Sequence, residues 1–414
     1  MADILVDSST GEIVEVGDDL SGDQTLDAQG CCVSPGFVDM HAHLREPGGE
    51  AAETIETGSR TAALGGYTAV VAMPNTNPTI DSASVVADVL ALAKDGLCHI
   101  SPSAAITVGR DGNELTGIGE LYDVGVRLFT DGGTAVQDAS IMRTALEYAK
   151  GIAAAGDSDI LFAQHCEVSG LSAGGVMNEG EWSTKLGLGG QPAEAEELMV
   201  ARDIALSRLT GMPIHMMNVS TAGSVELVRQ AKAQEIKVTA DACPHHFTLT
   251  DEACKDYDAT FKVHPPLRTD ADVAAIIEGL ADGTIDVIAT DHAPHESHTK
   301  QMPFDQAPPG MIGLETAFGL ANTQLGLDPV EIVDLMSIRP AELAGLSERH
   351  GRPVVAGEPA NLTVFDPTKK WTVDGANTAS RSSNCPFDQM ELTGKVRHTI
   401  FEGEAVVIEG EAQR

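Results

Sequence analysis

The sequence has no long hydrophobic run and no basic segment at its start. Its longest apolar stretches, such as Tyr67–Met73, are far shorter than the ~20 residues that span a bilayer. The first residues, MADILVDSSTG, contain no lysine or arginine and so lack the charged start of a secretory signal. We therefore predict a soluble, cytoplasmic protein.

Paired cysteines are also missing. The 7 cysteines are scattered, Cys31 and Cys32 are the two that adjoin, and no CxxC spacing occurs. This pattern argues against a disulfide framework and against a structural zinc knuckle. We expect the thiols to be reduced.

Basic residues are scarce. The chain has 26 lysines and arginines against 62 acidic residues, which gives a net charge of −36. This charge argues against nucleic acid and against an anionic membrane surface as partners. A small anionic substrate would be repelled as well, unless local cations override the field at its site. Arg45 is the candidate for such a local cation.

Two kinds of pattern divide the 414 residues. Residues 1–35 and 346–414 contain short strand-and-turn stretches, and we expect them to pair in one small β domain. Residues 36–345 alternate apolar strands with segments of helical periodicity, which indicates repeated βα units around a parallel sheet. The expected strands cover residues 36–43, 67–75, 99–109, 126–131, 159–167, 213–220, 237–246 and 285–295. The prediction is an α/β fold, a (β/α)8 TIM barrel with a small β-sandwich domain formed by the two ends of the chain.

Polar residues capable of chemistry gather at the ends of these strands. In a (β/α)8 barrel the C-terminal strand ends and the loops after them build the active site, so residues distant in sequence converge there. The residues concerned are His41, His43, Asn75, Asp131, His165, Asn218, His245, His246, Asp291 and His295.

The stretch VDMHAHLREPGG, residues 38–49, is the most informative part of the chain. His41 and His43 are separated by one residue on an expected strand, so their side chains leave the strand on the same face. Two imidazoles placed in this way can hold one divalent metal ion.

Several motifs together resemble those of the dihydroorotases of the amidohydrolase superfamily. HLREPG together with MPNTNP is the most specific pair, and the resemblance continues through FTDGG, QHCE, NVST, CPHHFTLTD, PPLRTD, ATDHAPH and APPGMIGLETA. It implies a metal-dependent cyclic amidohydrolase that reversibly hydrolyses dihydroorotate to N-carbamoyl-L-aspartate in pyrimidine biosynthesis. The implied cofactor is Zn²⁺, one or two ions per chain, with other divalent metals as alternatives.

The resemblance also implies a set of metal ligands. His41 and His43 match the first metal pair, His165 matches a ligand of the second metal, and Asp291 matches the final ligand and the proton carrier. Many relatives bridge the two metals with a carboxylated lysine at the end of the fourth strand. Here that strand ends in LFTD, and Asp131 matches the branch of the family that uses an aspartate instead.

Substrate contacts follow from the same resemblance. Arg45 would hold the substrate carboxylate through a bidentate fork, and Asn75 would act as a second donor. The complete set of implied substrate-binding residues is Arg45, Asn75, His264, His295, Pro309 and Gly310.

Two residues depart from the family pattern. Asn218 stands in MMNVST where relatives carry a histidine ligand, and an amide binds zinc poorly compared with imidazole. His264 stands in HPPLR where relatives carry an asparagine that contacts substrate. Either His264 or His215 could replace the missing ligand. The other possibility is an enzyme with one metal.

Alternative functions remain open at this point. An allantoinase or hydantoinase shares the paired histidines and the late aspartate but differs around Arg45. A weakly active or noncatalytic subunit that binds aspartate transcarbamoylase would account for Asn218. We expect a homo-oligomer, and a small domain trimmed at its N-terminal end, because relatives carry about one more β-hairpin there.

Overall fold

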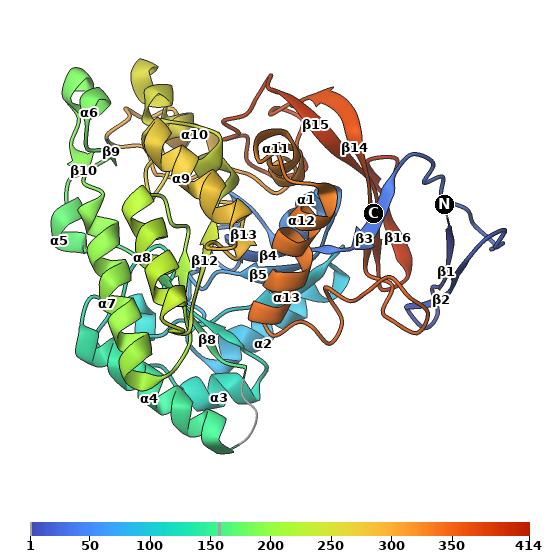
Figure 1. Cartoon of the computed structure of the whole chain (residues 1–414), viewed down its shortest axis with the longest axis horizontal. Helices are drawn as coiled ribbons and strands as arrows, with labels where there is room; N and C mark the ends of the chain where they lie inside the picture. Colours follow the sequence, from blue (N-terminus) through green and yellow to red (C-terminus); the bar gives the residue numbers. More distant parts are fainter. Residues whose placement is uncertain (1, 156–158) are drawn as a thin grey trace.

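Eight parallel strands form the centre of the molecule in the computed structural model, which describes residues 2–155 and 159–414 (Figure 1). The strands are β4 (Phe37–Ala42), β5 (Tyr67–Ala72), β6 (His99–Pro102), β7 (Leu128–Phe129), β8 (Leu161–His165), β11 (Ile214–Met217), β12 (Val238–Ala242) and β13 (Val287–Ile288). The first three form one sheet in the order β4-β5-β6, and the other five form a second sheet in the order β13-β12-β11-β8-β7. Each strand lies within one of the segments expected from the sequence.

Parallel bridges join the two sheets at both edges. Ala104, just beyond β6, pairs with Phe129 of β7, and Ala42 of β4 pairs with His292 beyond β13. Because all neighbouring strands run in the same direction, their C-terminal ends emerge on one side of the molecule. The polar residues that follow the strands are thereby brought to a common face.

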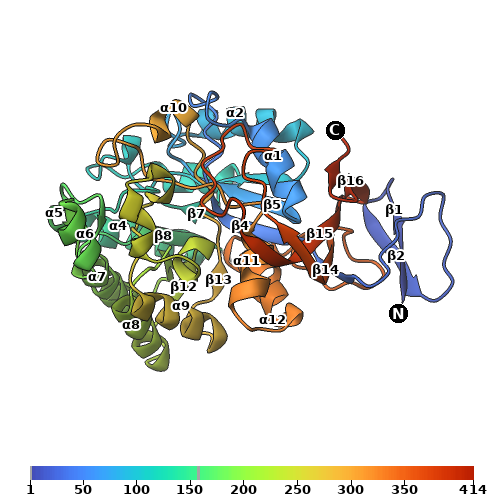
Figure 2. The same ribbon diagram turned by 90° about the horizontal axis from the view of Figure 1, so that it is seen from above.

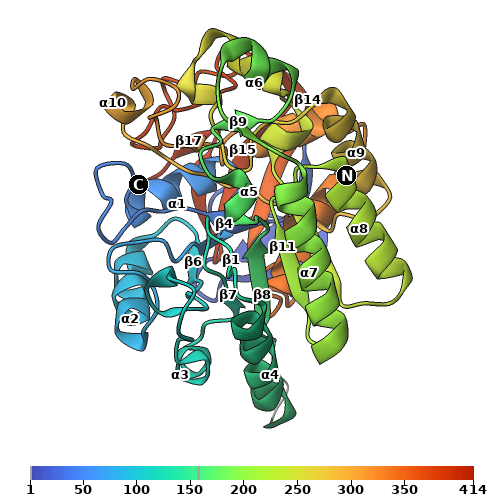
Figure 3. The same cartoon turned by 90° about the vertical axis from the view of Figure 1, so that its left-hand side faces the viewer.

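Helices cover the outside of the strands, as Figures 1 and 3 show for α2, α3, α4 and α7. The longer helices are α1 (Ile55–Leu64), α2 (Ala83–Leu92), α4 (Ala139–Ala155), α7 (Glu194–Thr210), α8 (Ala222–Ala233), α9 (Asp270–Ala281) and α11 (Ala317–Gln324). The shorter ones are α3 (Ile118–Asp123), α5 (Ser169–Ser172), α6 (Glu181–Leu186), α10 (Ser297–Lys300), α12 (Pro329–Val333) and α13 (Arg339–Leu343). Within the described residues, no helix combines the length and apolar character needed to cross a membrane.

Two apolar layers hold the strands in place. The larger one packs strand residues such as Phe129 and Phe162 against helix residues such as Met142 and Leu146. The smaller one lies largely among the strands themselves and includes Met40 of β4. Strands buried on both faces need near-continuous apolar sequence, which explains runs such as YTAVVAM.

The two ends of the chain meet in a separate sheet, which lies to one side of the eight parallel strands and the helices around them (Figures 1 and 2). This sheet has the order β17-β16-β15-β14-β3, and β3 pairs antiparallel with β14. Its strands are β3 (Cys32–Pro35), β14 (Leu362–Thr372), β15 (Glu391–Phe401), β16 (Glu404–Ile408) and β17 (Glu411–Ala412). A two-stranded hairpin, β1 (Asp3–Asp7) and β2 (Glu12–Gly17), lies beside it. A strand from near the start of the chain, β3, is therefore paired with one from near its end, β14.

Candidate metal centre at the strand ends

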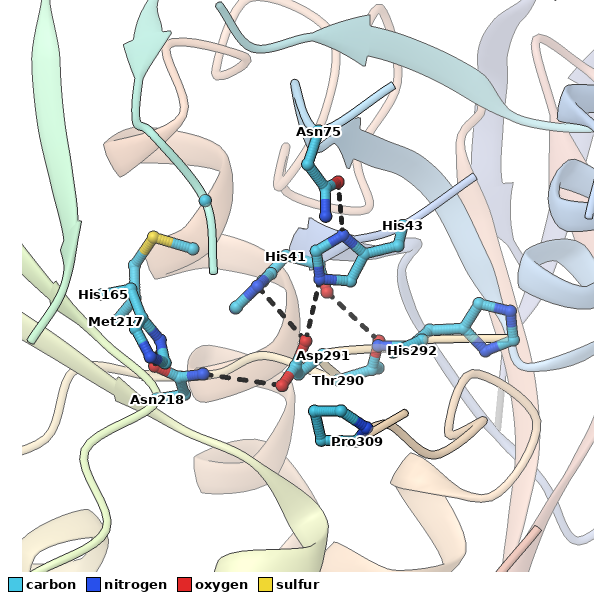
Figure 4. Close-up of polar contacts among 12 residues, drawn as sticks. His41, His43, Asn75, His165, Met217, Asn218, Thr290, Asp291, His292 and Pro309 are labelled. Atoms are coloured by element: carbon cyan, nitrogen blue, oxygen red, sulfur yellow. Dashed lines mark hydrogen bonds and ion pairs between the residues drawn. The ribbon is translucent and has the colours of Figure 1, made fainter. Parts of the chain in front are cut away.

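His41, His43 and Asp291 form a buried cluster of potential metal ligands (Figure 4). The Oδ1 atom of Asp291 lies 3.3 Å from Nε2 of His41 and 3.1 Å from Nε2 of His43. One ligand atom from each residue lies within 4.8 Å of the other two. Two imidazoles and one carboxylate at this spacing can surround a single divalent cation.

Contacts between β4 and the segment after β13 explain why these residues meet. The amide of His43 donates to the carbonyl of His292 over 2.8 Å. The buried carboxylate of Asp39 accepts hydrogen bonds from the amides of His41 and Thr290, over 3.2 Å and 3.0 Å. The first and last parallel strands are therefore fixed to each other directly beneath the cluster.

The protonation states of the cluster suit a metal site. Burial lowers the pKa of His43 to about 3, with a further contribution from the charge of Arg45. Burial also lowers the pKa of His41, although the nearby Asp291 opposes this effect. Both imidazoles are therefore neutral, which is the form that ligates.

Asn75 selects the ligating nitrogen of His43. Its Oδ1 atom lies 2.8 Å from Nδ1 of His43. An amide oxygen can only accept a hydrogen bond, so Nδ1 carries the proton and Nε2 keeps a lone pair for a cation.

The structure does not bring Asp131 to this cluster, contrary to its expected place as a bridging ligand. Its Oδ1 accepts hydrogen bonds from the amides of Ile106 and Thr107, over 2.8 Å and 3.0 Å, and its Oδ2 accepts one from the hydroxyl of Thr107. Arg110 donates to the backbone carbonyl of Asp131 over 2.7 Å. The side chain lies beyond the two residues of β7, where the contacts of the loop decide its direction.

His165 belongs to a second group of potential ligands, with Glu167 and His264. Nε2 of His264 lies 2.6 Å from Oε2 of Glu167, and the rings of His165 and His264 are 4.7 Å apart. Asn218 lies between the two groups, with Oδ1 3.2 Å from Nδ1 of His165 and Nδ2 3.5 Å from Oδ2 of Asp291. Sequence reasoning did not single out Glu167, although QHCE places it two residues after His165, the same spacing as His41 and His43.

His215 does not replace the ligand that Asn218 fails to provide. Its Nδ1 lies 2.8 Å from the hydroxyl of Thr239, and its Nε2 lies 2.9 Å from Oδ2 of Asp241. Both ring nitrogens are thus occupied at a buried position. Of the two replacements expected from the sequence, His264 is the one that lies beside His165.

A third group consists of Cys243, His245 and His246, directly after β12. All three side chains are buried. His246 Nε2 lies 3.1 Å from the carbonyl of Pro265.

Four of the residues expected to bind substrate, Arg45, His295, Pro309 and Gly310, form one rim beside the first cluster. Asn75 contacts His43 instead, and His264 lies in the second group. Nε of Arg45 donates to the carbonyl of Pro294 over 3.0 Å, and its guanidinium also lies 3.4 Å from Nε2 of His295. That nitrogen of His295 lies 2.8 Å from the carbonyl of Pro309. Gly310 has a φ of 143°, and a Cβ there would lie 2.7 Å from the ring of His295, so the close approach requires glycine.

Asn384 supports this rim and carried no signal in the sequence. Its side-chain amide donates to the carbonyls of Ala293 and Gly310, over 2.9 Å and 3.0 Å, and its Oδ1 accepts from the amide of His295. One buried side chain therefore ties the segment after β13 to the Pro309–Gly310 turn.

Comparisons with known proteins identify relatives of this chain. A family model described as "Dihydro-orotase-like" matches residues 30–224. The chain is 46% identical over 415 residues to a dihydroorotase of Streptomyces coelicolor, covering 99% of this chain and 95% of the relative. It is 48% identical over 403 residues to a dihydroorotase of Pelotomaculum thermopropionicum, covering 96% and 92%, and 47% identical over 419 residues to one of Mycobacterium tuberculosis, covering 99% and 95%.

Similar solved structures share the fold at lower identity. The dihydropyrimidinase of Brevibacillus agri has a TM-score of 0.84 and 23% identity, covering 100% of this chain and 93% of that one. The L-hydantoinase of Arthrobacter aurescens has a TM-score of 0.87 and 24% identity, covering 100% and 94%.

Proposed function

The chain belongs to the dihydroorotase family of cyclic amidohydrolases, and from this premise we propose that its His41–His43–Asp291 cluster is the centre at which dihydroorotate is hydrolysed. The reaction breaks the ring C–N bond, forms a C–O bond from water, and yields N-carbamoyl-L-aspartate in pyrimidine biosynthesis. The cluster carries the proposal because it places two neutral imidazoles and a carboxylate together at the strand ends of a chain with these relatives.

The proposal includes the architecture that holds the cluster. Residues 36–345 form a closed (β/α)8 barrel, and residues 1–35 and 346–414 form a small β-sandwich domain. The parallel bridges at Ala104–Phe129 and Ala42–His292 support closure of the ring of strands. The pairing of β3 with β14 supports a small domain built from both ends.

His41, His43 and Asp291 would hold a divalent cation, and the nitrogen-rich ligand set favours Zn²⁺. The cation would activate water and polarise the ring carbonyl. Asp291 takes the proton from the attacking water and returns it to the leaving ring nitrogen. Its Oδ1 faces both histidines and its Oδ2 faces the amide of Asn218 at 3.5 Å, so the carboxylate has a fixed orientation for this transfer.

Arg45 binds the carboxylate of the substrate in this proposal. The carbonyl of Pro294 accepts from Nε of Arg45 and so orients the guanidinium, and Asn75 offers its amide group from the other side of His43. A local cation is needed here because the net charge of −36 would otherwise repel an anionic substrate. His264, which was also expected to contact substrate, belongs with Glu167 to the second ligand group.

The test is hydrolysis of dihydroorotate by the zinc-loaded protein, with allantoin and hydantoin as competing substrates. We expect turnover of dihydroorotate, preference for it over both neutral ring compounds, and loss of turnover in Asp291→Asn. Equal or better turnover of allantoin or hydantoin would refute the substrate assignment. Full activity of Asp291→Asn would refute the role of the carboxylate.

A noncatalytic subunit is the second candidate, because Asn218 lies where relatives supply a ligand and because Asp131 lies outside the cluster. In that case the protein would copurify with aspartate transcarbamoylase and turn over none of the three substrates. For either candidate we place the protein in the cytoplasm as a homo-oligomer, which fractionation and light scattering would test.

A further inference from the structure

The group His165, Glu167 and His264 has the composition and spacing of a cation site of its own. His165 is the last residue of β8, Glu167 follows two residues later, and His264 lies in the loop before α9. One ligand atom from each lies within 4.8 Å of the others. Two imidazoles and a carboxylate form a ligand set typical of Zn²⁺.

The contacts of His165 point to a ligand. Its side chain is 1% exposed, and its Nε2 has no hydrogen-bond partner among residues 2–155 and 159–414. A buried polar atom of this kind carries a cost unless something occupies the space beside it. Nε2 of His165 is therefore available to bind a cation together with Glu167 and His264.

Asn218 fixes which nitrogen of His165 is available. Asp291 is an acceptor, so the side-chain group of Asn218 that faces it at 3.5 Å must be the NH₂. Its carbonyl oxygen therefore faces Nδ1 of His165 at 3.2 Å and requires the proton to be on that nitrogen. Nε2 is left with a lone pair, as in histidines whose other nitrogen is held by a partner outside the metal site.

Glu167 and His264 complete the site from the solvent side. Their side chains are 19% and 22% exposed, and Oε2 of Glu167 lies 2.6 Å from Nε2 of His264. The hydroxyl of Ser172 donates to Oε1 of Glu167, which orients the carboxylate and leaves Oε2 toward the histidines. Partial exposure gives a cation access and leaves room for a water or substrate oxygen as a further ligand.

We propose that His165, Glu167 and His264 bind a second Zn²⁺ ion that shares no carboxylate with the first, and that Asn218 is a positioning residue between the two sites. Each site has its own carboxylate, Asp291 in one and Glu167 in the other, while Asp131 is held by Ile106 and Thr107. This arrangement accounts for both departures in the sequence, since His264 supplies the imidazole that Asn218 does not. It deepens the proposed function by adding a positive charge beside the reaction centre, but metal binding is measurable without turnover.

The experiment measures zinc bound per chain after equilibrium dialysis against a graded series of free Zn²⁺ concentrations. Wild type is compared with Glu167→Gln, His264→Asn and Asn218→Ala, and circular dichroism checks the fold of each. His298→Asn is the matched control, because His298 also faces a glutamate, at 3.5 Å, but is 72% exposed on the surface. Co²⁺ substitution gives a second readout through the visible absorption of the bound ion.

We expect two zinc ions in wild type and in His298→Asn, and one in Glu167→Gln and His264→Asn. Asn218→Ala should bind the second ion about 10- to 100-fold more weakly, the usual effect of removing a group that orients a ligand. One zinc in wild type, unchanged by Glu167→Gln and His264→Asn, would overturn the proposal, and so would two tightly bound ions in all variants.

The same preparations separate this proposal from the function on which it rests. Hydrolysis of dihydroorotate by a wild type that binds one zinc would keep the function and refute the second site. Two ions that depend on Glu167 and His264, in a protein without turnover, would keep the second site and refute the function.

Discussion

Arg45 offers the sharpest test of how an acidic protein holds an acidic substrate. Its guanidinium is oriented by the carbonyl of Pro294 at 3.0 Å and lies 3.4 Å from Nε2 of His295. Burial lowers the pKa of Arg45 to about 10, which still leaves it charged at neutral pH. Arg45→Ala removes this charge, and Arg45→Lys keeps the charge but removes the planar fork.

The expected decrease in kcat/KM follows from the interaction free energy that the substrate carboxylate would lose. Truncating one member of a buried, hydrogen-bonded charge pair costs about 2–4 kcal/mol, because the other charge is left desolvated without a partner. This corresponds to a decrease of about 30- to 900-fold in kcat/KM for Arg45→Ala. The loss should fall mainly on KM, and Arg45→Lys should lie between Arg45→Ala and wild type.

The assay is steady-state hydrolysis of dihydroorotate, with zinc content measured on the same samples. Arg45 is outside the group His41–His43–Asp291, so its substitution should leave the metal content unchanged. Arg143→Ala is the control, since Arg143 pairs with Glu147 on an exposed helix face and is 52% exposed. A kcat/KM within about twofold of wild type would refute the reasoning, because the loss of a buried charge partner lowers kcat/KM by more than this.

Three further results are expected. Asp131→Asn should keep its zinc content while melting a few degrees lower, because the carboxylate supports the Thr107 segment; loss of zinc on dialysis would restore Asp131 as a ligand. Asn218→His should change the zinc stoichiometry little, as His264 already lies beside His165; a gain of one tightly bound ion would show that the second site had been empty. Glu315→Gln should melt higher than wild type at pH 8 and equally near pH 4. Burial raises the pKa of Glu315 to about 7, so the folded state keeps its proton to higher pH than the unfolded chain, and stability falls as the pH rises from about 4.5 through 7. A melting difference that does not vary with pH would contradict this account.

The paired histidines could be read from the sequence because a strand fixes the direction of its side chains. His41 and His43 lie in and just after β4, where alternation alone places both on one face. Asp291 could be placed for a related reason, since it follows the last parallel strand. In these cases local geometry and strand order were sufficient.

The remaining parts of the site depend on contacts that no local pattern encodes. Asp131 lies two residues beyond β7, where its direction is set by donors at Ile106 and Thr107. His264 reaches His165 from a loop whose course depends on the whole structure. Asn384 reaches the Pro309–Gly310 turn from near the other end of the chain. The sequence therefore predicted which residue types to expect and missed several of their partners.

The bridge between Ala42 and His292 places the first cluster where the first and last parallel strands are joined. His43 and Asp291 are 248 positions apart, so the cluster cannot form until the last parallel strand has been synthesised and has docked against the first. A cation that takes ligands from both segments would bind only when β4 and the segment after β13 are paired, and at 100 times its Kd it would add about 2.7 kcal/mol to that pairing. Chelation should therefore loosen the β4–β13 junction before other parts of the molecule, and amide hydrogen exchange at His43 would report that opening.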